Sequence, residues 1–261
     1  MGNIHRKTIG VFGKMDIKMK KNKKVNNQVK TINISDEADF RLVESYKALR
    51  TNLMLSLSLK EGDTKCHRVL LTSSIPGEGK STTVVNLAIT LVQMQARVLI
   101  IDADMRKPTV HKYFGLESRL GLSNLLSGMN TKEQCVYSID NIPGLSVIPA
   151  GILPPNPSEL LGSNAMKRLL AEFEKDYDYI IIDTPPINVV ADALAVVQEV
   201  DGVVFVVAQD RTGYPEVSKA METLRFANAN VIGAVLNHSQ NDKNKGSYSS
   251  KYKYAYYGTQ E

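Results

Sequence analysis

The sequence has few of the residues that mark several common classes of protein. Its two cysteines, Cys66 and Cys135, are 69 positions apart and form no C-x-x-C pair, so we expect no redox motif, zinc site or disulfide framework. The four histidines form no H-E-x-x-H motif. No apolar run approaches the ~20 residues that a membrane-spanning helix needs. With 43% hydrophobic and 23% charged residues, the 261-residue chain has the composition of a globular protein with a full core.

Charge and aromatic residues are unevenly distributed along the chain. The net charge is +5, yet residues 1–30 hold nine lysines and arginines against a single acid, so the rest of the chain carries −3. We therefore expect residues 1–34 to be a basic, disordered leader. Residues 240–261 contain one aliphatic residue but five of the eleven tyrosines, and we expect a flexible tail. These tyrosines are Tyr248, Tyr252, Tyr254, Tyr256 and Tyr257.

Residues 35–239, between these two segments, predict one α/β domain. Tyr46, Leu49, Leu53 and Leu57 recur at helical spacing and predict an amphipathic helix over 37–58. Further along, short runs of Val and Ile without polar alternation indicate strands that are covered on both faces. The pattern predicts a doubly wound, mostly parallel sheet with helices on both faces. The expected strands are 68–72, 97–102, 145–149, 178–183, 202–208 and 231–236, and the expected helices are 80–95, 108–113, 122–127, 157–177, 191–199 and 215–229.

A glycine-rich segment between the first strand and the next helix predicts a phosphate-binding loop. It ends in the G-K-S of the Walker A pattern, although Ser74 stands where that pattern has its first glycine. Backbone N–H groups at Gly77 and Gly79, with the helix N-terminus, would form a cradle for phosphate oxygens. Lys80 would bridge the β- and γ-phosphates, and the Ser81 hydroxyl would bind Mg²⁺. The expected nucleotide-binding residues here are Ser74, Pro76, Gly77, Glu78, Gly79, Lys80, Ser81 and Thr82.

Three aspartates follow buried strands, at the edge where a doubly wound sheet binds its ligand. Asp102 ends the strand 97–102, Asp104 follows it, and Asp183 ends the strand 178–183. Burying an unpaired carboxylate costs free energy. A bound Mg²⁺ ion, which prefers hard oxygen ligands, would compensate the charge of such residues. A single aspartate, Asp183 for example, fits a helix N-cap equally well. The three together favour an ATP–Mg²⁺ site.

These motifs resemble those of the bacterial tyrosine kinases (BY-kinases) of capsular and exopolysaccharide synthesis, in the MinD/ParA-like P-loop superfamily. The segments G-E-G-K-S-T (77–82), D-A-D-M-R-K-P (102–108) and Y-I-I-I-D-T-P-P (179–186) are similar to the family's Walker A, A′ and B motifs. N-P-S-E-L-L (156–161) and the tyrosine-rich tail also resemble it. The resemblance implies an ATP- and Mg²⁺-dependent protein-tyrosine kinase. It implies that Lys80, Asp102, Asp104 and Asp183 are catalytic, that Asp102 orients or deprotonates the attacking tyrosine, and that Ser81, Asp104 and Asp183 lie at the metal.

The same resemblance implies an assembly and partners. Glu44, Lys47 and Arg50 fall on the family's E-x-x-R-x-x-R oligomerisation motif, but Lys47 replaces an arginine and cannot form its planar fork. Taken alone, this spacing fits a solvated ion pair on a helix. The family implies a homo-oligomeric ring in which tail tyrosines enter the site of a neighbour and are phosphorylated there. It also implies a cytoplasmic chain held at the inner face of the membrane by a separate adaptor's cytoplasmic tail, and a protein-tyrosine phosphatase as a partner.

Two other functions remain open from the sequence. A positioning or partitioning ATPase of the same superfamily would carry a signature lysine early in the loop, where this chain has Ile75. A nucleic-acid-binding tail would explain the alternating lysines and tyrosines of residues 251–254. We expect no nucleic acid as a partner, because the tail accompanies a complete set of ATP–Mg²⁺ residues. Asn237, after the last strand, is the candidate for adenine recognition.

Overall fold

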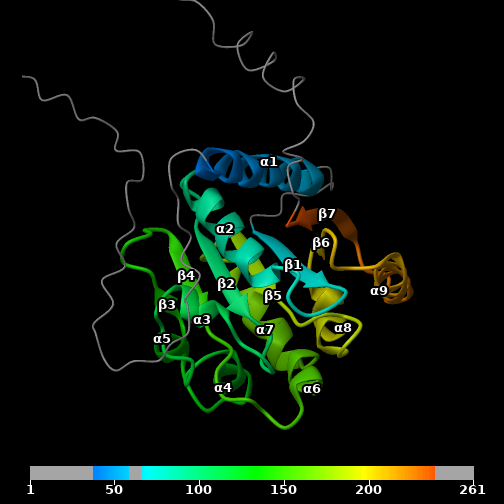
Figure 1. Cartoon of the computed structure of the whole chain (residues 1–261). Coiled ribbons are helices and arrows are strands. Elements are labelled where there is room, and N and C mark those ends of the chain that lie inside the picture. The colour runs from blue at the N-terminus through cyan, green and yellow to red at the C-terminus, as the bar shows by residue number, and fades with distance from the viewer. Residues whose placement is uncertain (1–37, 59–65, 239–261) are drawn as a thin grey trace, which may run out of the picture.

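The computed structural model describes residues 38–58 and 66–238. In these residues seven strands form one sheet in the order β3-β4-β2-β5-β1-β6-β7 (Figure 1). Neighbouring strands are parallel except β3 and β4, which pair antiparallel. The predicted doubly wound, mostly parallel fold is confirmed. The strands are β1 His67–Ser73, β2 Val98–Asp102, β3 Tyr137–Ser138, β4 Leu145–Ile148, β5 Tyr179–Asp183, β6 Gly202–Ala208 and β7 Val231–Asn237.

Helices cover both faces of this sheet because the central strands are apolar on both sides. Val69 and Leu71 of β1 pack with one set of helices, whereas Leu70, between them, packs with the other set. The first face is covered by α1 Ala38–Ser58, α2 Lys80–Val92 and α3 Val110–Tyr113. The second face is covered by α4 Leu122–Leu126, α6 Pro157–Leu161, α7 Asn164–Phe173, α8 Asp192–Val196 and α9 Tyr214–Phe226.

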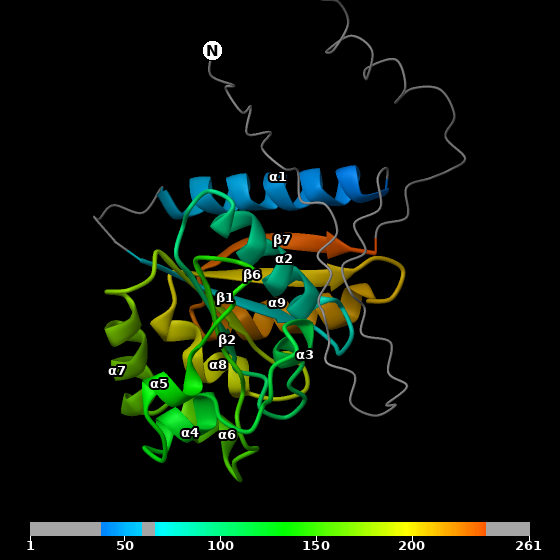
Figure 2. The ribbon, with the colours of Figure 1, turned by 90° about the vertical axis from the view of Figure 1, so that its left-hand side faces the viewer.

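The first helix, α1, has the predicted apolar stripe and uses it to dock. Leu53 and Leu57 are buried, and Leu49 packs beside them. Figure 2 shows α1 lying along the same side of the molecule as α2 and β7. None of the described helices combines the length and apolar character that crossing a membrane requires. Both cysteines are buried and free, as expected.

Several helix boundaries differ from the prediction. The single helix expected over 157–177 is wrong: the chain forms α6 and α7, separated by Gly162 and Ser163. The Ser163 hydroxyl accepts the Met166 N–H and starts α7 afresh. The helix expected over 80–95 ends earlier, at Val92, and Gln95 follows with a positive φ of 64°.

Other short elements were not predicted or were predicted too long. The helix expected over 108–113 begins at Val110, and that over 191–199 ends as a 3₁₀ turn, η1 Val197–Glu199. Strand β3 and helix α5 Lys132–Cys135 were missed, because two and four residues carry too little periodicity to be recognised. None of these differences affects the three central strands that carry the predicted site.

Candidate active site

The three acidic and glycine-rich motifs lie at one edge of the sheet because their strands are neighbours. Strands β2, β5 and β1 are adjacent, and each runs into one motif at its carboxyl end. Asp102 ends β2 directly opposite Asp183, which ends β5. β1 and β2 follow one another in the chain but are not neighbours in the sheet. β5, which comes later in the chain, lies between them. This reversal of strand order is where doubly wound sheets bind their ligands.

The phosphate-binding loop has the backbone geometry that the sequence predicts. Gly77 and Gly79 have φ values of 81° and 90°, in the left-handed region that favours glycine. A Cβ atom on Gly79 would lie 2.5 Å from the side-chain nitrogen of Asn237. Helix α2 begins at Lys80, so its first N–H groups are free to point at an anion. The loop therefore fits a bound phosphate.

Glu78 supports the loop from inside the fold. Its fully buried carboxylate accepts the Ile75 N–H at 2.8 Å, the Ala208 N–H at 3.2 Å and the Thr212 hydroxyl at 2.6 Å. Three donors satisfy a buried carboxylate. The side chain of this predicted nucleotide-binding residue is therefore turned into the protein, toward the segment after β6, and only its backbone belongs to the cradle.

Two further side chains contact the same loop. The Asn237 amide donates to the Glu78 carbonyl at 2.9 Å and to the Thr83 hydroxyl at 3.1 Å. Arg211 donates to the Gly77 carbonyl at 3.0 Å. Asn237, the predicted adenine contact, thus lies at the loop and is bonded to it. The role of Arg211 was not foreseen, because it lies in a loop more than 130 residues from the motif.

The remaining predicted residues of the loop differ in exposure. Pro76 is exposed, Lys80 is 7% exposed and Ser81 is partly buried. The Ser74 hydroxyl is buried and has no partner among the described residues. Thr82 shares a 2.7 Å hydrogen bond with the Tyr113 hydroxyl of α3, a contact that the sequence did not suggest. The loop thus presents Lys80 and Ser81 to the site, while Thr82 ties it to α3.

Asp102 is fully buried and holds its own loop together. One carboxylate oxygen accepts the Asp104 N–H at 3.2 Å, and the other accepts the N–H groups of Thr109 and Val110 at 3.1 Å each. Burial and the neighbouring Asp183 carboxylate raise the pKa of Asp102 well above its usual value, although these N–H groups oppose the shift. The carboxylate is thus a stronger proton acceptor than a solvated one.

Asp183 is the buried group whose environment is least satisfied. Both of its oxygens are buried and have no hydrogen-bond partner in the described part of the chain. Burial raises the pKa of Asp183 to about 6, although the Lys80 charge and the nearby Ser81 hydroxyl lower it. A buried carboxylate without donors needs a ligand to compensate it.

The donor set at this edge fits Mg²⁺ together with phosphate. Ser81, Asp104 and Asp183 offer hard oxygen atoms, and Asp104 is only partly buried. The described residues contain no cluster of three or more acidic, His or Cys side chains that could hold a metal unaided. Beside a nucleotide, Mg²⁺ is usually bound by one or two carboxylates together with phosphates and waters.

The predicted oligomerisation residues lie on α1. Glu44 and Lys47 form an exposed ion pair with each other, at 2.7 Å. Arg50 instead donates to the Thr90 carbonyl at 2.8 Å, in the last turn of α2. Arg50 therefore fastens α1 to the body of its own subunit. The five tail tyrosines lie outside the described residues.

The fold and the glycine-rich loop define a P-loop NTPase. A family model described as "ParA: NUBPL iron-transfer P-loop NTPase" matches residues 65–256, and the chain belongs to that class. Tyrosine-protein kinase YwqD of Bacillus subtilis (strain 168) is 40% identical over 218 residues, which cover 84% of this chain and 87% of that protein. Within the class, the chain belongs to the bacterial tyrosine kinases of capsular and exopolysaccharide synthesis.

Solved structures agree with this family. The crystal structure of the chimerical protein CapA2B2 has a TM-score of 0.73 and 36% identity, covering 80% of this chain and 89% of that one. The kinase domain of the Escherichia coli tyrosine kinase ETK has a TM-score of 0.69 and 33% identity, and 79% of each chain is covered. The resemblance drawn from the motifs is therefore confirmed, and the tyrosine kinase is preferred over the positioning ATPase.

Proposed function

We propose that this tyrosine kinase transfers the γ-phosphoryl group of ATP to tyrosines 248–257 of a neighbouring copy, and that this controls capsular or exopolysaccharide synthesis and export. The observation that carries the proposal is the unpaired, buried Asp183 carboxylate at the same sheet edge as Lys80 and Asp102. An unsatisfied carboxylate beside a phosphate cradle is an arrangement built for a metal-bound nucleotide.

Each residue of the site has a proposed role toward ATP and Mg²⁺. The loop 74–82 would hold the phosphates, with Lys80 at the β- and γ-phosphates, and Asn237 would lie toward the adenine. Ser81, Asp104 and Asp183 would hold the metal. When bound, Mg²⁺ supplies positive charge that the phosphoryl group needs as its bonds loosen.

Asp102 is the proposed acceptor of the tyrosine proton. Phosphoryl transfer depends more on positioning than on a strong base, and a phenol with a pKa near ~10 is still protonated at neutral pH. A carboxylate within hydrogen-bond reach therefore has to accept the proton only late in the transfer. Oδ2 of Asp102 accepts two backbone N–H groups and Oδ1 accepts only one, so Oδ1 keeps an acceptor site that the tyrosine hydroxyl would use.

The partners follow from the same family. We propose a homo-oligomeric ring that uses Glu44, Lys47 and Arg50, activation by the cytoplasmic tail of a membrane adaptor, and reversal by a protein-tyrosine phosphatase. The protein would then act in the cytoplasm, at the inner face of the membrane. Each phosphate adds about −1.5 to −2 charges. Because the chain outside its basic leader is already acidic, phosphorylated tails would be repelled from the ring.

Autophosphorylation of the purified full-length chain tests the proposal. The protein is incubated with ATP and Mg²⁺, with and without an adaptor's cytosolic tail, and modified residues are mapped by mass spectrometry. We expect phosphate on residues 248–257, none with Lys80→Met, and none when EDTA removes the metal. ATP hydrolysis without tail modification in both conditions would instead support a positioning ATPase.

A further inference from the structure

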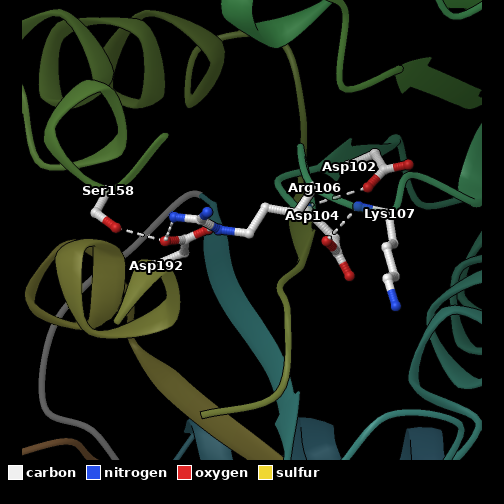
Figure 3. A network of polar contacts seen from close by, with 6 residues as sticks. All are labelled: Asp102, Asp104, Arg106, Lys107, Ser158 and Asp192. Carbon is white, nitrogen blue, oxygen red and sulfur yellow. Dashed lines mark hydrogen bonds and ion pairs between the residues drawn. The ribbon is translucent and has the colours of Figure 1, made fainter. Parts of the chain in front are cut away.

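An ion pair between an exposed arginine and a buried aspartate connects the loop after β2 to α8, the helix that follows β5. The Asp192 carboxylate, fully buried in the first turn of α8, accepts two hydrogen bonds from Arg106, at 2.8 Å from Nε and 3.1 Å from Nη2. Ser158, in the first turn of α6, donates its hydroxyl to the same carboxylate. Figure 3 shows Ser158, Asp192 and Arg106 in line, with Asp102 and Asp104 beyond the backbone of Arg106.

The position of Arg106 in the chain gives this pair its importance. Arg106 is two residues after Asp104 and four after Asp102, and Asp192 is nine residues after Asp183. Near its start, this loop is tied to β5 by the Ala103 N–H, which donates to the Asp183 carbonyl at 2.8 Å. Arg106 provides a second connection, two residues beyond Asp104.

Hydrogen bonds within the loop connect both aspartates to the residues around Arg106. Asp102 binds three of its N–H groups, and Asp104 accepts the Lys107 N–H at 3.0 Å. A shift at Arg106 would therefore be passed to both carboxylates. An arginine bound through two parallel hydrogen bonds fixes orientation as well as distance, which lysine cannot do.

We propose that Arg106, Asp192 and Ser158 are positioning residues for phosphoryl transfer: together they fix the loop of Asp102 and Asp104 relative to Asp183. This inference rests on the proposed function, in which these three aspartates serve the reaction. Misplacing a reacting group by about 1 Å can lower a rate about 100-fold. The N-P-S-E-L-L segment thereby acquires a role, because its Ser158 holds the buried end of the pair.

The test compares this pair with a second Arg–Asp pair of the same chain. Arg97 binds Asp178 through Nη2 at 2.8 Å and Nε at 3.4 Å, just before β2 and β5 begin and so at the far end of the same strands. The variants Arg106→Lys, Asp192→Asn and Ser158→Ala are measured beside Arg97→Lys and Asp178→Asn, all in the full-length chain. The readout is the kcat of autophosphorylation per ADP-binding site, so that unfolded protein is not counted.

We expect Arg106→Lys and Asp192→Asn to lower kcat per site about 10- to 100-fold, and Ser158→Ala about threefold to tenfold. The affinity for ADP should stay within about threefold, and the Arg97 and Asp178 variants should keep kcat within about twofold. If Asp192→Asn does not fold, Arg106→Lys and Ser158→Ala decide the question. Wild-type kcat in those two variants, or equal losses in the control pair, would overturn the inference.

One further variant separates this inference from the proposed function. Asp104→Asn should be inactive if the aspartates serve the reaction. An active Asp104→Asn protein would contradict the proposed function itself. An inactive Asp104→Asn protein beside a fully active Arg106→Lys protein would contradict only the positioning role.

Discussion

Asp183 shows, at the scale of a single residue, that a residue of the proposed active site can destabilise the fold. Its carboxylate is 1% exposed, and none of the described residues donates a hydrogen bond to it. Asp178 is the residue just before the same strand, and its carboxylate accepts hydrogen bonds from the backbone and side chain of Arg97. Asp178 therefore stabilises the fold at one end of β5, whereas Asp183 destabilises it at the other end, because its buried charge lacks hydrogen-bond donors.

These two aspartates should respond oppositely to the same substitution. Without nucleotide at pH 7, Asp183→Asn should raise the free energy of unfolding by about 1–3 kcal/mol, because it removes an unpaired buried charge. It should also lower autophosphorylation by at least about 100-fold. Chemical denaturation and a kinase assay measure the two effects.

Asp178→Asn is the matched control for this prediction. It should lower the free energy of unfolding by about 1 kcal/mol, since it loses a partly exposed ion pair, and it should leave the kinase rate unchanged. Equal destabilisation by both substitutions would show that the Asp183 site is satisfied within the protein.

Much of the site could be predicted residue by residue, because its signals are local. The glycine-rich loop and the aspartates after apolar strands each occupy a few consecutive residues. The direction of the Glu78 side chain could not be predicted, since its partners Ala208 and Thr212 are at least 130 residues away. The Arg106–Asp192 pair could not be predicted for the same reason, since its members are 86 positions apart.

Individual elements show the same division between local and distant causes. Strand β6 was predicted with its observed bounds, because five of its seven residues are Val or Phe in an unbroken run. The break between α6 and α7 was missed although Gly162 and Ser163 are a C-cap and N-cap pair. An apolar periodicity that continues across such a break favours one long helix. A prediction of helix boundaries therefore has to consider possible capping residues as well as the periodicity of apolar residues.

Arg50 leads to a prediction for α1 as an element. Arg50→Ala should lower the free energy of unfolding by about 1–2 kcal/mol, because a charged hydrogen bond to the last turn of α2 is lost. Lys47→Ala, which removes only an exposed pair with Glu44, should change it by about 0.5 kcal/mol or less.

Denaturation at two protein concentrations separates this effect from assembly. If the decrease in the free energy of unfolding is the same at both protein concentrations, Arg50 stabilises the docking of α1 within one subunit. A loss confined to high concentration would show that Arg50 stabilises only the contact between subunits of the proposed ring, and that its bond to Thr90 adds nothing to the stability of one subunit.

At the scale of the whole molecule, transfer between copies can be tested by complementation. One variant carries Lys80→Met and keeps its tail tyrosines; the other keeps its active site but has all five tail tyrosines replaced by phenylalanine. Each alone should incorporate no phosphate into its tail. Mixed with ATP and Mg²⁺, they should place phosphate on the Lys80→Met chain, as mass spectrometry can establish.

The dependence on concentration provides the control for that experiment. Transfer between copies should slow as the mixture is diluted, and an excess of the Lys80→Met chain should restore it. Tail phosphate that appears in the wild type but never in the mixture would show that each chain modifies only itself.

The contact of Asn237 with the phosphate-binding loop has a geometric consequence for any ring. β7 ends against that loop. The proposed acceptor tyrosines therefore follow, along the chain, a residue that contacts the proposed ATP site of the same subunit. Tyr248 is 11 residues beyond Asn237 and Tyr257 is 20, so a fully extended chain spans at most about 40 Å and about 70 Å. These spans limit the distance between Asn237 and the active site of a neighbouring subunit. A site farther away than the span to Tyr257 cannot be reached by any of the five tyrosines. A site at a distance between the two spans can be reached only by tyrosines that follow Tyr248.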